Sequence, residues 1–141
     1  MINSSLIKQE FAKRFGPETP ETDCCARLFD FFTKTKSSSL RHLTYVRLRD
    51  ISNYPDTVLI SALLFLSSAK INILDQRYEF LDTEDDEYIE IEPDVVSSAI
   101  KNNEFYHPES GKKVENFKRN LFIYYKISDE FKSHVDSGRV E

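Results

Sequence analysis

The sequence is poor in glycine and cysteine and has no tryptophan. Only three Gly occur among 141 residues, which argues against a glycine-rich phosphate-binding loop or a β-sandwich dense in turns. The two cysteines, Cys24 and Cys25, are adjacent, and adjacent cysteines rarely form a disulfide because the bond strains the peptide between them. We therefore expect reduced thiols buried on a helix of a cytoplasmic protein, with a reactive thiol as the alternative.

The sequence also lacks the residue spacings that catalysis and metal binding require. The three histidines, His42, His107 and His134, are far apart, and no pair has the spacing of helical metal ligands. His107, which precedes Pro108, is typical of a turn. No serine occupies a nucleophile elbow, and the carboxylates lie in the most polar stretch, where little burial would raise a pKa. We expect a protein that is not an enzyme and binds no metal or cofactor. Weak cation binding by the loop 82–87 is the alternative.

Long hydrophobic runs are absent as well. The longest apolar stretch, residues 58–66, is too short to span a bilayer. Residues 1–15 contain four charged side chains and do not resemble a signal peptide. We therefore expect no membrane partner.

What the sequence has in excess is negative charge in its middle. Residues 51–100 carry a net charge of −9, whereas residues 1–50 carry +3 and residues 101–141 carry +1. Eight carboxylates and no Lys or Arg lie between Asp82 and Asp94. Such a block opposes general attraction to DNA, RNA or anionic lipid.

Hydrophobic periodicity predicts an α+β fold. The eleven Phe and seven Tyr of the chain predict that its core is rich in aromatic side chains. Residues 1–21 are expected to form a helical arm and linker, residues 22–105 the main domain, and residues 106–141 an extension that packs on it. The expected helices are 4–15, 22–36, 49–53, 57–69 and 93–103, and the expected strands are 43–48, 73–81 and 87–91, with an acidic loop at 82–86.

Apolar residues at helical spacing predict which faces are buried. The predicted inward residues are Ile7, Phe11 and Phe15 in the first helix, Cys25, Leu28, Phe29 and Phe32 in the second, and Val95, Val96, Ala99 and Ile100 in helix 93–103.

In the last segment, the spacing of Val114, Phe117 and Leu121 favours a helix that becomes extended near the aromatics of 121–127. Residues 136–141 should fray.

From residue 22 to residue 91 the expected order is helix, strand, short helix, helix, strand, acidic loop, strand. The chain resembles the winged helix-turn-helix superfamily in this order and in its hydrophobic spacing. The residues that carry the resemblance are Val46, Leu48 and Ile51, then Tyr54, Pro55 and Asp56, then Val58, Ala62, Leu63 and Leu66, then residues 78–81.

The resemblance implies that helix 57–69 occupies the position of a recognition helix and that the acidic hairpin is the wing. The helix carries Thr57, Ser61, Ser67 and Ser68, with Lys70 following, but no Arg, Asn or Gln to read bases. A wing of carboxylates repels phosphate. This departure favours docking to a protein, as in winged helices that serve as interaction modules.

We therefore expect a winged-helix-like adaptor or accessory subunit of a larger prokaryotic complex. Its first helix would pack in a groove or across a homodimer. The acidic hairpin would steer a partner protein with a basic surface. Its expected partner-binding residues are Asp82, Glu84, Asp85, Asp86 and Glu87.

The alternative is a DNA-binding transcriptional regulator that uses basic patches outside the wing. A third reading is an acidic mimic of DNA that occupies a nucleic-acid-binding site on another protein. The basic residues that could contact nucleic acid or an acidic partner form two groups: Arg41, Arg47 and Arg49, and Lys112, Lys113, Lys118 and Arg119.

Overall fold

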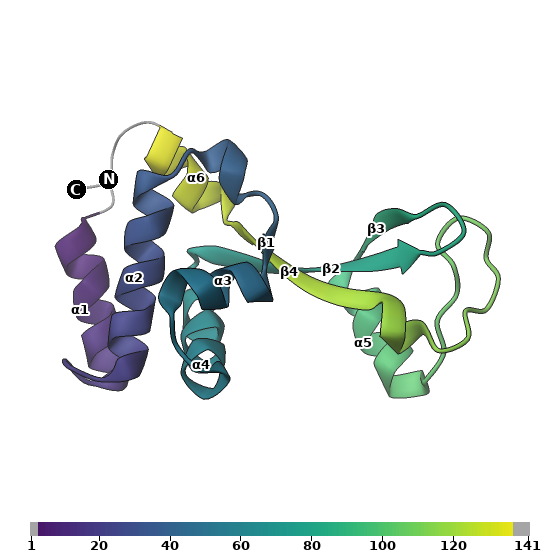
Figure 1. Cartoon of the computed structure of the whole chain (residues 1–141), viewed down its shortest axis with the longest axis horizontal. Coiled ribbons are helices and arrows are strands. Elements are labelled where there is room, and N and C mark those ends of the chain that lie inside the picture. The colour runs from purple at the N-terminus through teal and green to yellow at the C-terminus, as the bar shows by residue number, and fades with distance from the viewer. Residues whose placement is uncertain (1–2, 137–141) are drawn as a thin grey trace. The chain divides into compact units, whose positions relative to one another are not determined.

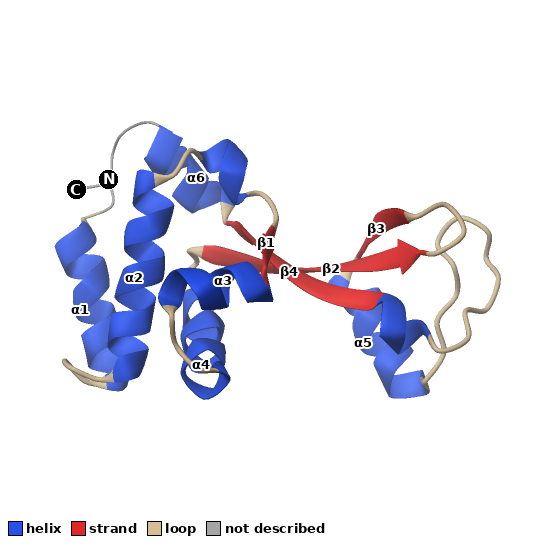
Figure 2. Cartoon of the chain, in the orientation of Figure 1, coloured by secondary structure: helices blue, strands red, loops and turns tan. Residues whose placement is uncertain are grey.

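The computed structural model describes residues 3–136 and has an α+β architecture, as expected (Figures 1 and 2). Within these residues no helix has both the length and the apolarity needed to cross a membrane. The helices are α1 (Ser4–Phe15), α2 (Pro20–Lys34), α3 (Tyr45–Ser52), α4 (Asp56–Leu66), α5 (Pro93–Asn102) and α6 (Asp129–Asp136), with short 3₁₀ helices η1 (Ser37–Leu40) and η2 (Phe117–Asn120). The strands are β1 (Leu43–Thr44), β2 (Leu74–Asp82), β3 (Glu87–Ile91) and β4 (Leu121–Ile127), which form one sheet in the order β1-β4-β2-β3.

The chain divides into two compact units. Unit 1 comprises residues 1–76 and 125–141, and unit 2 comprises residues 77–124. The boundary therefore falls within β2 and within β4. These bounds differ from the expected division at residues 21 and 105, because the C-terminal segment returns to the core of unit 1 through Tyr125, Ile127 and Phe131.

Helix α1 packs on its own chain through the predicted apolar stripe. Phe11 is fully buried, and Ile7 and Phe15 are half-buried against the same core. The ring of Phe11 lies 6.1 Å from that of Phe29 in α2, edge to face, and the ring of Phe15 lies 5.5 Å from that of Phe65. The stripe is thus already occupied within the chain.

Helix α2 begins two residues earlier than predicted. The hydroxyl of Thr19 accepts a hydrogen bond from the amide of Thr22, and Pro20 occupies the first turn, where its missing N–H costs nothing. The predicted face is confirmed. Cys25, Leu28, Phe29 and Phe32 are all fully buried, together with Cys24.

The predicted strand 43–48 is wrong beyond its first two residues. The hydroxyl of Thr44 accepts a hydrogen bond from the amide of Arg47, which caps α3 and starts the helix at Tyr45. Helix α3 therefore begins four residues before the predicted 49–53 and ends at Ser52, followed by Asn53, whose backbone is left-handed with φ 58°. The capping bond outweighs the β propensity of the short Tyr45-Val46 run.

Helix α4 is shorter than predicted and buries only one of its apolar faces. Leu59, Ala62, Leu63 and Leu66 are buried, whereas Ile60 and Leu64 are 49% and 64% exposed. The helix ends at Leu66 rather than at residue 69. It therefore presents aliphatic side chains to solvent.

Unit 2 is built around the predicted hairpin. Strands β2 and β3 pair antiparallel, with Phe80 opposite Ile89 and Asp82 opposite Glu87. Phe80 and Ile91 pack with Val96, Phe105 and Phe117 in a second hydrophobic core.

Helix α5 covers this core with a narrower face than predicted. Val96 and Ala99 are buried as expected, but Val95 and Ile100 are 49% and 53% exposed. Val96 and Ala99 are three residues apart and therefore lie on the same face of the helix.

The last described segment differs most from expectation. The predicted helix from Val114 is wrong: a 3₁₀ turn at Phe117–Asn120 leads into β4. The extended conformation expected near residues 121–127 is confirmed, while α6 was not predicted. The amide of Ser128 donates to the carbonyl of Ile73, 2.8 Å away, which ties the end of β4 to the start of β2. Of the residues expected to fray, Asp136 is the last of α6, and 137–141 lie outside the described residues.

Candidate functional site

The acidic hairpin of unit 2 presents four of its five predicted carboxylates to solvent. Glu84, Asp85 and Asp86 lie in the turn, and Glu87 begins β3. All four side chains are exposed, and we call them the acidic tip. Asp86 has φ 55°, a left-handed conformation that Asp tolerates in tight turns.

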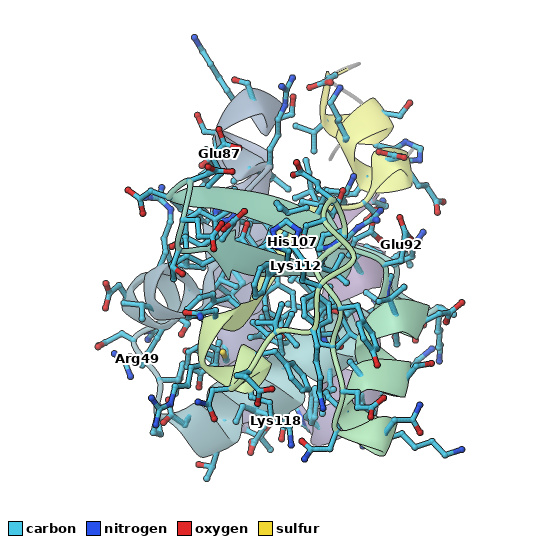
Figure 3. All side chains as sticks on the ribbon, turned by 90° about the vertical axis from the view of Figure 1, so that its right-hand side faces the viewer. Arg49, Glu87, Glu92, His107, Lys112 and Lys118 are labelled. Atoms are coloured by element: carbon cyan, nitrogen blue, oxygen red, sulfur yellow. The ribbon has the colours of Figure 1, made fainter. Side chains whose placement is uncertain are left out.

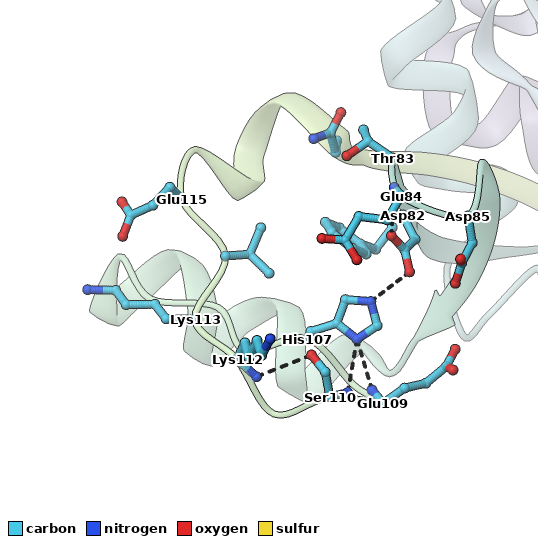
Figure 4. A pocket seen from close by; sticks show the side chains of 13 residues that line it. Asp82, Thr83, Glu84, Asp85, His107, Glu109, Ser110, Lys112, Lys113 and Glu115 are labelled. Atoms are coloured by element: carbon cyan, nitrogen blue, oxygen red, sulfur yellow. Dashed lines mark hydrogen bonds and ion pairs between the residues drawn. The ribbon is translucent and has the colours of Figure 1, made fainter.

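Asp82, the fifth predicted residue, is only 6% exposed and supports the turn from within (Figure 4). One carboxylate oxygen, Oδ2, lies 2.8 Å from Nε2 of His107. The other, Oδ1, accepts the amide of Glu84 at 3.1 Å. The hydrogen bond from His107 is the largest cause that lowers the pKa of Asp82, and the amide of Glu84 acts in the same direction against the effect of burial.

His107 is held through both ring nitrogens. Its Nδ1 accepts the amides of Glu109 and Ser110, at 3.1 and 3.2 Å. Because Nδ1 is an acceptor, these contacts assign the proton to Nε2, which donates to Asp82. The ring also stands edge-on to Phe80 at 5.9 Å. This imidazole therefore has no free nitrogen for proton transfer or metal binding, and it closes the turn in which it was predicted to lie.

A recess of about 550 Å³ lies beside this pair, entirely within unit 2. Phe80 and Val114 supply apolar surface to it. Lys112 and Lys113 also line it (Figure 4). Acidic residues predominate among those that line it, with five against the two lysines: Asp82, Glu84, Asp85, Glu109 and Glu115.

The two predicted basic groups belong to different units. Arg41, Arg47 and Arg49 are exposed in unit 1, and Lys112, Lys113, Lys118 and Arg119 are exposed in unit 2. The guanidinium of Arg47 lies over the ring of Phe31 at 5.6 Å, and that of Arg49 lies 3.8 Å from Asp56. Within unit 2, Lys112 lies near His107, whereas Lys118 lies well away from Glu87 (Figure 3).

An exposed aromatic pair lies on the face of the unit 2 sheet opposite its core. Ile89 and Ile91 of β3 pack into the core, so the alternating Tyr88 and Glu90 point to the other face. Tyr88 is 59% exposed, and its ring lies 6.2 Å from that of Phe122. The hydroxyl of Tyr124 donates to Glu90 at 3.0 Å, and Arg77 lies 3.7 Å from the same carboxylate. Sequence reasoning missed this face, although the alternation in residues 87–91 indicated it.

The cysteines are buried as predicted and have no disulfide partner. Burial raises the pKa of Cys24 to about 11 and that of Cys25 to about 12. Both thiols are therefore protonated at neutral pH, which makes them poor nucleophiles. Among residues 3–136 no group of three or more His, Cys, Asp and Glu side chains is arranged to hold a metal ion.

Comparison of the chain with protein-family models, with curated proteins and with solved structures finds no match. Its function is therefore inferred from the geometry, burial and charge of the residues described above.

Proposed function

We propose that this protein is a non-enzymatic interaction module that docks onto a partner protein through unit 2. The observation that carries the proposal is the acidic tip, four exposed carboxylates on a turn that the Asp82–His107 pair supports from inside. A supported turn holds its charges in place before binding, which reduces the entropy lost on association.

Charge distribution supports the same conclusion. Unit 2 contains twelve Asp and Glu against six Lys and Arg, a net charge of −6, whereas the rest of the chain has a net charge of +1. An acidic surface attracts a basic partner over several ångströms and raises the association rate. The partner class is therefore a protein with a basic surface.

The arrangement in unit 1 also favours protein docking over DNA reading. The order α2, β1, α3, α4 in unit 1, followed by the hairpin β2–β3 that extends into unit 2, supports a winged-helix-like interpretation, with α4 in the position of a recognition helix. On α4 the outward side chains include Ile60 and Leu64, which cannot hydrogen-bond to bases or phosphates. The apolar stripe of α1 packs on its own chain, so this helix is not part of the proposed docking surface.

Charge reversal at the tip tests the proposal. The tagged chain is used to isolate partners from its host cells, together with a variant carrying Asp85→Lys and Asp86→Lys. The matched control carries Glu18→Lys and Asp50→Lys, two exposed carboxylates of unit 1. We expect a basic partner that the tip variant loses and the control retains. Recovery of the chain alone, or equal binding by both variants, would contradict the proposal.

A DNA-binding regulator is the second candidate, favoured by the exposed Arg41, Arg47 and Arg49 in and before α3. Such a protein would shift random duplex DNA at low salt, and the shift would be lost on Arg47→Ala with Arg49→Ala. The absence of any shift would exclude this candidate.

A further inference from the structure

Strand β3 is the last strand of its sheet. It pairs with β2 and, among residues 3–136, with no other strand. In an antiparallel ladder, alternate residues of an edge strand turn their N–H and C=O groups away from the neighbour. Within the described part of the chain, the outer edge of β3 therefore offers unpaired backbone donors and acceptors, a template for another strand.

The side chains along this edge carry negative charge. Glu87 and Glu90 lie in β3 and Glu92 follows it, and all three are exposed. Glu90 is bonded to Tyr124 and Arg77, whereas Glu87 makes no ion pair with any residue between 3 and 136. Tyr88, on the outward face, adds an apolar surface beside these carboxylates.

These charges select the kind of strand that can be added. If the β3 edges of two copies paired, their glutamates would come close together, and like charges across a strand pair are destabilising. A strand with Lys or Arg would instead gain attraction from the same carboxylates.

We propose that the edge of β3 is a strand-addition site for an extended, basic segment of the partner protein. This inference rests on the proposed function, which it deepens by naming the docking mode. The segment alternates cationic and β-branched residues. Its backbone pairs with β3, its cationic side chains lie on the face of Tyr88 and Glu90, and its β-branched side chains lie on the face of Ile89 and Ile91.

A peptide of alternating Lys and Val, seven residues long, is the probe. Its binding to the full chain is measured by calorimetry, and two further peptides carry N-methyl groups on alternate residues in the two possible phases. N-methylation in one phase blocks hydrogen bonds to β3 and should weaken binding about tenfold or more, whereas the other phase should retain it. Equal affinity for the two phases, or no binding of the parent peptide, would overturn the inference.

Charge variants locate the site. Glu87→Lys with Glu92→Lys should weaken binding of the Lys peptide about tenfold and allow binding of a peptide of alternating Glu and Val. The matched control is Glu18→Lys with Asp50→Lys, two exposed carboxylates of unit 1, which changes the net charge equally but not the edge of β3 and should leave the affinity nearly unchanged. An equal effect of the control would show that net charge alone governs binding and would overturn the inference.

The two proposals fail in different ways. Partner capture that depends on Asp85 and Asp86, combined with no difference between the N-methylated peptides, would retain the interaction module and refute strand addition. Self-association that strengthens on Glu87→Lys would identify a second copy as the occupant and refute the basic segment. If the natural chain captured no partner and bound no peptide, both proposals would be refuted.

Discussion

At the scale of single residues, the pair Asp82 and His107 determines the character of the site. A carboxylate and an imidazole 2.8 Å apart suggest acid–base chemistry, but the remaining ring nitrogen accepts two backbone amides. A catalytic base requires a nitrogen or oxygen that can reach substrate. The pair instead joins the hairpin turn to the loop that follows α5.

Replacing His107 by Ala should destabilise unit 2. The change leaves the buried carboxylate of Asp82 and the amides of Glu109 and Ser110 without their partner, and unpaired buried polar groups are unfavourable. We expect a fall of several degrees in Tm in a thermal unfolding experiment. Glu109→Ala, which keeps the amide and removes only an exposed side chain, is the control and should leave Tm nearly unchanged.

The contribution of Asp82 to stability should depend on pH. Because its folded pKa is lowered, the stabilisation is fully present above the unfolded pKa of about 3.9 and is lost as pH falls through the folded value. Urea unfolding of the natural chain and of Asp82→Asn should therefore differ at pH 7 and converge toward pH 3. A difference that persists unchanged at the lowest pH would contradict this assignment.

At the scale of elements, helix α4 has one face that is buried in the core of unit 1 and another that is exposed to solvent. Leu59 is fully buried in the core of unit 1, and Leu64, on the same helix, is 64% exposed. Ile60, four residues before Leu64, is 49% exposed, so this line of α4 presents aliphatic side chains to solvent.

The two leucines form a matched pair of substitutions. Leu59→Ala should lower the free energy of unfolding by about 2–5 kcal/mol, because it removes buried methyl groups and leaves a cavity. Leu64→Ala should change it by less than about 0.5 kcal/mol, as for an exposed position. Urea unfolding measures both values. Similar losses for the two variants would show that Leu64 is buried, which would contradict the exposed face.

At the scale of the whole molecule, charge is distributed unevenly between the two units. The chain has a net charge of −5, and unit 2 alone has −6. Such a field repels polyanions in general while leaving short-range contacts in unit 1 possible.

Polyanion binding is therefore expected to be negligible. At about 0.1 M salt, where the screening length is about 10 Å, the chain should pass through a heparin column without retention and should bind a polycationic resin. Asp85→Lys with Asp86→Lys should reduce retention on the polycationic resin. Strong retention of the natural chain on heparin would favour the DNA-binding candidate instead.

Local patterns in the sequence determined those helices and strands in which buried side chains recur at the regular spacing of a helix or a strand. The α1 stripe, the buried face of α2 and the hairpin 74–91 with its acidic turn follow from spacing and composition, because each depends on residues that are close in sequence. The tertiary structure decided the rest. Residues 121–127 become a strand because β2 is there to pair with them, and Asp82 meets a histidine 25 positions away. Such contacts join residues that no local period relates, so only the folded chain brings them together.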